Sequence, residues 1–189
     1  CALPIYPDQA VVTQRFTDAG FAAPQFVQQP DGTSQALVRD PGGFDIVIQI
    51  RSDAADHSED GVGIGVHVSD LATSRAFYRD FVGLDELAPV ADPMLGTTLY
   101  PYRHAETTVL LYNMGENLPA DNGNAGIQYV VSDAPFVAAM GAHRDVTVET
   151  PLNKLTGFDL VTVWFNDPDG VTNYFAQVGP NSRTARGEN

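Results

Sequence analysis

The sequence has little cysteine, little positive charge and no long apolar run. Cys1 is the only cysteine in 189 residues, so the chain cannot form an internal disulfide bond. Ten Lys and Arg residues stand against 24 Asp and Glu residues, which gives a formal net charge of −14. Nucleic acids and anionic membrane surfaces attract basic patches, so this composition argues against both as partners. No apolar run approaches the length of a membrane-spanning helix.

Two common catalytic patterns are also missing. The glycine-rich stretch 61–65 stands at the start of a predicted strand, without the helix that must follow a phosphate-binding loop. No Ser-His-Asp signature is evident. Cys1 lies within the predicted first strand and is poorly placed as a nucleophile. That position favours a chain that lacks upstream sequence over the alternative, a bacterial lipoprotein acylated at Cys1, and the cytoplasm is the favoured compartment.

What the sequence does contain is a local pattern that occurs three times. A short apolar strand runs into an Asp, an amphipathic helix follows, and a Gly and further strands come next. The three aspartates are Asp8, Asp70 and Asp133. Asp8 is well placed to cap a helix over about 8–19, and either Ser69 or Asp70 to cap a second helix over 71–81. A third, short helix is expected around 135–142. A repeat of this kind predicts an α+β fold built from βαβββ units, none of which buries its own apolar face alone.

Two stretches resemble a known family. Residues 66–84 (VHVSDLATSRAFYRDFVGL) resemble the opening unit of the vicinal oxygen chelate superfamily, which includes glyoxalase I, extradiol dioxygenases and bleomycin resistance proteins. Residues 165–177 (FNDPDGVTNYFAQ) resemble its closing hairpin, which 39–50 repeats. The resemblance covers nearly the whole chain. It implies a cup-shaped sheet made by paired βαβββ units, but it implies no single reaction, because one fold carries many chemistries.

The resemblance implies the following domain organisation. Residues 62–179 form a complete domain of two units, 62–113 and 125–179. Residues 1–51 are an orphan unit, the second half of an incomplete domain. An acidic linker at 52–61 separates them, and 180–189 form a flexible tail. The orphan unit would expose an apolar sheet face, so we expect a homo-oligomer or completion by a missing N-terminal unit.

Metal-dependent members of the superfamily carry ligands on the first and last strand of each unit. The resemblance places these positions at Gly63, Gly126, Val47, Val109 and Tyr174. Glycine and valine have no donor side chain, so we expect neither a metal centre nor another cofactor. A site built from His67 with His104 or Glu106 is conceivable, but the family pattern does not favour it.

The alternation of side chains along a strand predicts what lines the cup instead. Gly63, Gly65 and His67 share one face of their strand, as do Gly126 and Gln128. We predict a ligand-binding site formed by eight residues: Gly63, Gly65, His67, Gly126, Gln128, Trp164, Thr172 and Tyr174. Glycines in a strand often mark close approach of another group. The alternative interpretation is structural: His67, Gln128 and Trp164 serve the core, and Tyr174 fills the space that a metal would take.

Two function classes remain open from the sequence. In the first, the chain is a metal-independent binding protein that holds a small, cationic or aromatic molecule in the cup of residues 62–179. In the second, it is an enzyme of the same superfamily, an isomerase, lyase or dioxygenase-like protein. That enzyme would use His67 and Tyr174 as acid and base, or a divalent metal that the pattern does not reveal. A degenerate unit that only stabilises a larger assembly is a third interpretation. We favour the first.

Overall fold

The computed structural model describes residues 2–41, 45–54, 62–105, 107–113, 115 and 126–179. Cys1, His57, Glu106, most of the predicted linker and the predicted tail lie outside the described residues. The chain divides into two compact units, each described here by itself. Unit 1 comprises Cys1–Val68 and Leu84–Gly115, and unit 2 comprises Ser69–Gly83 and Glu116–Asn189.

The three repeated aspartates each cap a helix, which the sequence predicted for Asp8, while it left Ser69 and Asp70 as alternatives for the second helix. The helices are α1 (Gln9–Asp18), α2 (Leu71–Ala76) and α3 (Ala134–His143). A carboxylate oxygen accepts a backbone N–H from Ala10 (2.7 Å) in the first, from Thr73 (2.7 Å) in the second and from Phe136 (2.9 Å) in the third. Each bond satisfies an amide that the first helical turn leaves without an acceptor. No helix among these described residues is long and apolar enough to cross a membrane.

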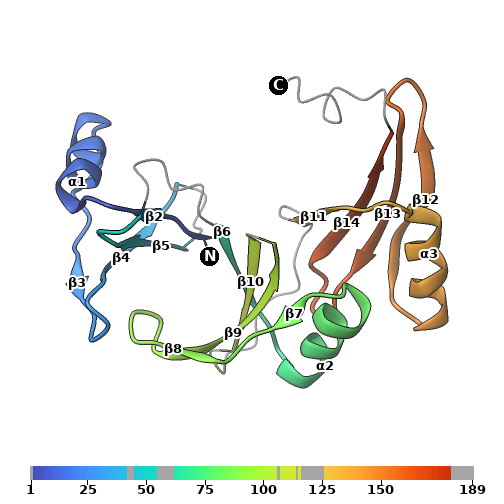
Figure 1. Ribbon diagram of the computed structural model, residues 1–189, viewed down its shortest axis with the longest axis horizontal. Coiled ribbons are helices and arrows are strands. Elements are labelled where there is room, and N and C mark those ends of the chain that lie inside the picture. Colours follow the sequence, from blue (N-terminus) through green and yellow to red (C-terminus); the bar gives the residue numbers. More distant parts are fainter. Residues whose placement is uncertain are drawn as a thin grey trace. The chain divides into compact units, whose positions relative to one another are not determined.

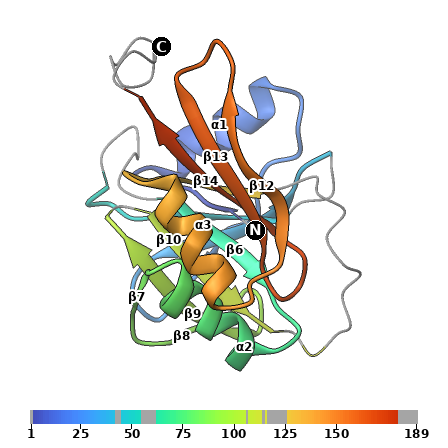
Figure 2. The same cartoon turned by 90° about the vertical axis from the view of Figure 1, so that its right-hand side faces the viewer.

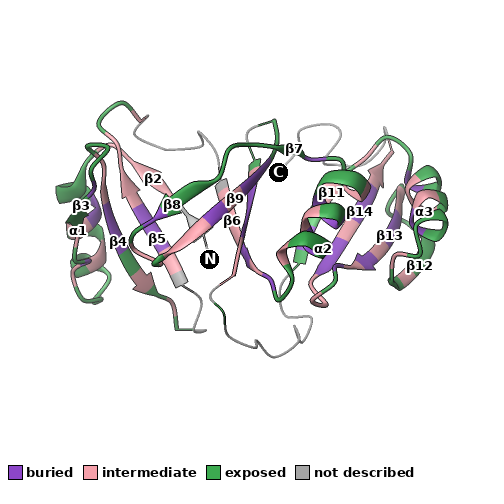
Figure 3. Ribbon diagram, turned by 90° about the horizontal axis from the view of Figure 1, so that it is seen from below, coloured by how far each residue is buried: buried purple, intermediate pink, exposed green. Residues whose placement is uncertain are grey.

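Unit 1 is built on a ten-stranded sheet, in which the path β3-β4-β5-β1-β6-β10-β9-β7 is extended by β2 on β5 and β8 on β9 (Figure 1). Its strands are β1 (Ala2–Leu3), β2 (Ile5–Tyr6), β3 (Val27–Gln28), β4 (Ser34–Arg39), β5 (Asp45–Ile50), β6 (Val62–His67), β7 (Asp85–Glu86), β8 (Val90–Asp92), β9 (Thr97–His104) and β10 (Thr107–Tyr112). Buried residues concentrate in β4, β5, β9 and β10, whereas α1 is mostly exposed (Figure 3).

The sheet pairing divides the chain differently from the predicted domain boundaries. β1 pairs antiparallel with β6, so the strands of residues 1–51 and 62–113 belong to one sheet. The 1–51 segment therefore finds a partner within the chain. The pairing of β1 with β6 joins residues about 60 positions apart in the sequence, and local sequence patterns do not encode such long-range hydrogen bonds. The predicted pairing of 62–113 with 125–179 as one domain stays a prediction.

Unit 2 is a four-stranded sheet in the order β11-β14-β13-β12, with the helices α2 and α3. Its strands are β11 (Gly126–Val130), β12 (Val148–Leu155), β13 (Leu160–Asn166) and β14 (Thr172–Val178). Figure 2 shows α3 in front of β12, β13 and β14. The core of the unit is Val163, Phe165 and Phe175, with Phe81 and Val82 packed against it. The helix of the middle repeat is therefore part of the third repeat's core.

Three local features differ from the sequence predictions. The helix expected over 71–81 changes after Ala76 into a π-helix, η1 (Phe77–Phe81), in which Val82 N–H donates to the Phe77 carbonyl (3.0 Å). β12 continues to Leu155 instead of ending at residue 149, although it contains Pro151. It is an edge strand with register shifts, a place where proline is tolerated. The short edge strands β7 and β8 were not predicted.

Candidate functional site

The predicted site residues divide between the two units. Five of them, Gly126, Gln128, Trp164, Thr172 and Tyr174, lie on β11, β13 and β14 of unit 2. The other three, Gly63, Gly65 and His67, lie on β6 of unit 1. Each group is described within its own unit.

The five residues of unit 2 share one face of the sheet. Gln128 and Trp164 both stand directly opposite Tyr174, from the two strands that flank β14. Thr172 stands opposite Gly126, two residues along the same strand. The face that alternates with this one carries Phe165 and Phe175, which belong to the core beneath the helices. The predicted period of two is therefore present, and the polar and aromatic side chains lie on the face opposite the core.

An aromatic pair occupies the middle of this open face. The rings of Trp164 and Tyr174 meet edge to face, with centroids 4.7 Å apart and an interplanar angle of 81°. Both side chains are half-buried, whereas Gln128 is exposed. A Cβ added to Gly126 would collide with the Tyr174 ring. Within unit 2, the strand glycine thus makes room for the Tyr174 ring.

A carboxylate that the sequence analysis did not single out lies beside this pair. The hydroxyl of Thr172 donates a hydrogen bond to Glu149 Oε2 (2.7 Å). Thr172 is buried, while Glu149 on β12 is exposed. The register shift between Val148 and Thr150 determines where Glu149 stands on the edge strand. No local pattern in residues 146–149 signals that shift, so the contact could not be inferred from the sequence.

In unit 1, β6 carries the remaining predicted residues on one face. Gly63, Gly65 and His67 stand opposite Thr108, Leu110 and Tyr112 of the parallel neighbour β10. The His67 ring lies 5.2 Å from the Tyr112 ring, centroid to centroid, at an angle of 54°. The predicted alternation along β6 is thus present.

The positions that bear metal ligands in the superfamily do not fit a divalent-metal centre here. Val47 and Val109 are fully buried and have no donor atom. Val109 stands opposite Ile64, so it lies on the other face of the sheet from Gly63 and Gly65. Gly126 is covered by the Tyr174 ring. Among the described residues, no group of three or more His, Cys, Asp or Glu side chains is arranged to hold a metal.

A buried polar network holds the closing hairpin of unit 2. Asp167 accepts hydrogen bonds from the Tyr78 hydroxyl (2.9 Å) and from the backbone N–H groups of Asp169 (2.9 Å) and Val171 (2.8 Å). Burial raises the pKa of Asp167, and burial together with the Asp167 charge raises the pKa of Tyr78. Nearby, the Tyr129 hydroxyl donates to Asn173 (3.2 Å). The Asp-Pro motif of the sequence thus stabilises a turn through two backbone N–H groups of the hairpin, and the Tyr78 hydroxyl ties that turn to η1.

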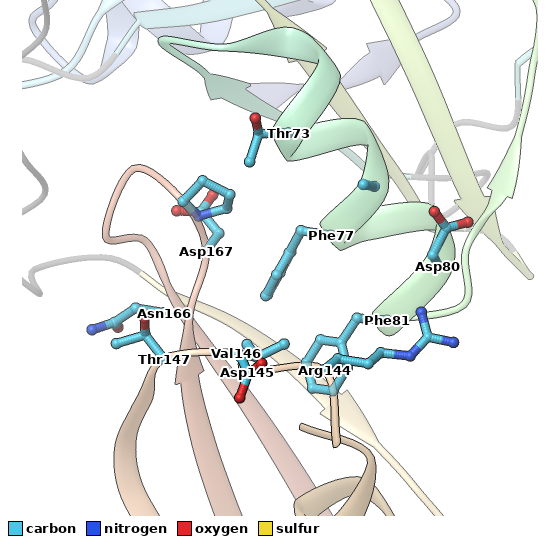
Figure 4. A pocket seen from close by; sticks show the side chains of 12 residues that line it. Thr73, Phe77, Asp80, Phe81, Arg144, Asp145, Val146, Thr147, Asn166 and Asp167 are labelled. Carbon is cyan, nitrogen blue, oxygen red and sulfur yellow. The ribbon is translucent and has the colours of Figure 1, made fainter. Parts of the chain in front are cut away.

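A pocket of about 480 Å³ lies beside this network (Figure 4). Phe77 and Phe81 from η1 form its apolar wall, and Arg144 runs beside the Phe81 ring. Asp80 and Asp145 bring negative charge to the rim, and Asp80 is paired with Arg79 (2.7 Å). The sequence analysis did not anticipate this pocket, because it forms only when residues 73–81 pack against the hairpin of 166–168.

No protein-family model and no curated protein sequence matches the chain. Solved structures do match. A glyoxalase I variant from Zea mays aligns with a TM-score of 0.73 at 18% identity, over 93% of this chain and 66% of that one. Glyoxalase I from Leishmania major, described as trypanothione-dependent, aligns with a TM-score of 0.53 at 20% identity, over 67% and 91%.

A glyoxalase family protein from Enterococcus faecalis aligns with a TM-score of 0.52 at 15% identity, over 62% of this chain and 95% of that one. The chain thus spans about two thirds of the Zea mays protein and nearly all of the two shorter ones. At these identities the likeness concerns the fold. The chain has the βαβββ fold of the glyoxalases, as its resemblance to the vicinal oxygen chelate superfamily implied.

Proposed function

We propose that the protein binds a small organic molecule without a metal, on the open face of β11, β13 and β14. The observation that carries this proposal is the shared face of Gln128, Trp164, Thr172 and Tyr174, opposite the apolar core of the unit. Small-molecule sites combine an apolar or aromatic surface with a few directional hydrogen-bonding groups, and these four side chains supply both. The participation of Gly63, Gly65 and His67 in the same site stays a prediction.

The chemistry of this face favours an aromatic cation. The rings of Trp164 and Tyr174 offer aromatic surface, to which cations and flat molecules are attracted. Glu149 adds a negative charge at the edge of that surface, bonded to Thr172. The net charge of −14 acts in the same direction, because it draws cations toward the chain and repels anions.

Trp164 is the only tryptophan, so its fluorescence reports on the proposed site alone. Benzyltrimethylammonium is a suitable cationic probe, and benzoate is its anionic counterpart. We expect benzyltrimethylammonium to change the Trp164 emission in a saturable manner, and benzoate to leave it unchanged. Tyr174→Leu should weaken binding about five- to tenfold, since a cation–aromatic contact contributes about 0.5–1 kcal/mol at an exposed site and the lost ring surface adds to that.

Phe158→Leu is the matched control, because Phe158 is an exposed aromatic residue in the β12–β13 turn, outside the proposed face. It should bind the probe like the parent. Equal responses to the cation and to benzoate would refute the proposal, as would an unchanged affinity in Tyr174→Leu.

The second candidate function is an enzyme of the same superfamily, with His67 and Tyr174 as acid and base or with a divalent metal. The likeness in fold to glyoxalase I favours it. Elemental analysis of protein purified without chelator, followed by thermal-shift titration with Ni²⁺, Zn²⁺, Mn²⁺ and Fe²⁺, separates the two candidates. Stoichiometric metal, or a melting temperature that rises with metal concentration, would favour the enzyme. Neither result is expected if the protein is a metal-independent binder.

The predicted association of copies, or completion by an N-terminal unit, also stays a proposal. Its basis in the sequence was the unpaired sheet of residues 1–51, and that sheet is continuous with β6 in the structure. Sedimentation equilibrium on the chain tests the first alternative: a mass of twice 20.3 kDa supports a dimer, and a mass of 20.3 kDa rules out self-association at the concentration used.

A further inference from the structure

Unit 1 contains a cavity of its own, distinct from the open face of unit 2. Its volume is about 800 Å³, within the range typical of small-molecule sites. One wall is formed by the β3–β4 turn, β4 and β5, and the other by β8, β9 and the turn between them. Leu110 of β10 also lines it. Leu110 stands opposite Gly65 of β6. The cavity therefore lies on the face of the sheet that carries Gly63 and Gly65.

Three glutamines line this cavity. Gln35 on β4 and Gln49 on β5 stand directly opposite each other, and Gln29 begins the turn after β3. Gln29 and Gln35 are each only 8% exposed. The two place neutral amides beside an apolar part of the lining that includes Val90, Leu99 and Leu110.

The side chain of Gln35 is incompletely satisfied. Its Oε1 atom is buried and accepts no hydrogen bond from any group that the structure describes. Buried polar atoms are normally bonded, so an orphaned oxygen beside a cavity requires an explanation. Rotation of the amide about its last torsion exchanges Oε1 with Nε2, so this group can turn either a donor or an acceptor toward a ligand.

The charges around the cavity are negative. Asp92 is buried and accepts the backbone N–H groups of Met94 (2.9 Å) and Leu95 (3.0 Å). Asp31 stands at the rim, and hydrogen bonds from Thr33 lower the pKa of its carboxyl, so it is ionised at neutral pH. Among the residues that the structure describes, Lys, Arg and His do not line the cavity. Two carboxylates without a facing cation disfavour an anionic ligand.

We propose that this cavity binds an uncharged organic molecule with an apolar body and an amide-like edge, which presents an N–H donor and a carbonyl acceptor to Gln35 and Gln49. Each glutamine amide can then donate an N–H to the ligand carbonyl or accept the ligand N–H through its oxygen. The Gln35 Oε1 atom thereby gains a hydrogen-bond donor. The apolar body lies against Val90, Leu99 and Leu110. The proposal does not depend on the cationic site of unit 2.

Benzamide is the probe, because it combines a flat apolar ring with one primary amide. Benzoate is its matched anion of nearly the same shape. In ¹⁵N-labelled protein of residues 1–189, the side-chain NH₂ signals of Gln35 and Gln49 are assigned by their loss in Gln35→Leu and Gln49→Leu. We expect benzamide at millimolar concentration to shift both signals, and benzoate to shift neither. Gln35→Leu should raise the dissociation constant of benzamide about tenfold.

Gln25→Leu is the control, because Gln25 is an exposed glutamine of unit 1 that does not line the cavity. It should leave benzamide binding unchanged, whereas failure of the unit 2 site would appear only in the Trp164 titration. The comparison of benzamide with benzoate uses the parent protein, so it holds even if a variant fails to fold. Equal shifts by the two compounds, no shift of the Gln35 and Gln49 signals, or unchanged affinity in a folded Gln35→Leu protein would overturn the proposal.

Discussion

The hydroxyl of Tyr78 donates a hydrogen bond to the carboxylate of Asp167, 89 residues later in the chain, at 2.9 Å. Both side chains are buried, Tyr78 completely and Asp167 with 4% exposure. The bond joins the helix of the middle repeat to the closing hairpin of the third. A second tie runs in parallel, because the Ser69 backbone N–H and hydroxyl both donate to Asp169 in the same hairpin. Unit 2 is thus held together across sequence repeats.

Tyr78→Phe should destabilise unit 2. The variant keeps the ring but leaves the buried carboxylate of Asp167 without its hydroxyl partner, which costs about 1.5–3 kcal/mol for a bond to a charged group. Urea unfolding followed by Trp164 fluorescence measures the loss. Tyr129→Phe is the control, because its hydroxyl bonds a neutral partner, Asn173, at 3.2 Å, and should cost about 1 kcal/mol or less. Equal losses of unfolding free energy in Tyr78→Phe and Tyr129→Phe would show that the charge of Asp167 does not strengthen its hydrogen bond.

Asp167 also makes stability depend on pH. Burial raises its pKa in the folded protein above the value of 3.8 for an unperturbed carboxyl. The folded state therefore holds this proton more tightly than the unfolded state, so stability falls as pH rises from about 3.8 through the folded pKa. Asp167→Asn removes this proton and keeps an acceptor for the hairpin N–H groups.

We expect the difference in unfolding free energy between parent and Asp167→Asn to fall as pH rises through that interval and to stay constant above it. Paired denaturant titrations between pH 3.5 and pH 8 test this, since the exposed carboxylates contribute equally to both proteins and cancel. A difference that increases with pH would mean that the hydrogen bonds of Asp167 outweigh its burial.

The sequence predicted the local parts of this structure well. Asp8, Asp70 and Asp133 cap helices because an N-cap depends only on the next few residues. The shared faces of Thr172 with Tyr174 and of Gly126 with Gln128 followed from the period of two within each strand. Features set by distant pairing were not accessible. The entry of β1 beside β6, the shifted register of β12 that brings Glu149 to Thr172, and the glutamine-lined cavity all require tertiary contacts.

Gly141→Ala tests packing between α3 and the sheet. Alanine is the better helix former by about 1 kcal/mol. A Cβ at this position would, however, collide with the ring of Phe165, which is fully buried in the core of unit 2. Overpacking of a filled core costs about 1–3 kcal/mol and should prevail, so the variant should be less stable. Differential scanning calorimetry gives the sign. Ala139→Gly, on an exposed position of the same helix, isolates the propensity effect, and a more stable Gly141→Ala protein would show that the Phe165 ring yields freely.

Gly126→Ala tests whether the Tyr174 ring or the backbone of the neighbouring strand excludes a side chain at Gly126, the glycine on the open face. The added Cβ would collide with the Tyr174 ring and stand 2.9 Å from the Thr172 carbonyl oxygen. If the ring is what excludes a side chain here, the variant should lose about 1–3 kcal/mol. Tyr174→Leu should then relieve most of that loss, which a double-mutant cycle measures as a coupling energy. If the losses are additive, the Thr172 carbonyl oxygen rather than the Tyr174 ring excludes a side chain at Gly126, because that carbonyl is present with either Tyr or Leu at position 174. A large coupling would mean that Tyr174 fills the space left by Gly126, and that a ligand on this face meets the outer edge of the ring rather than the glycine.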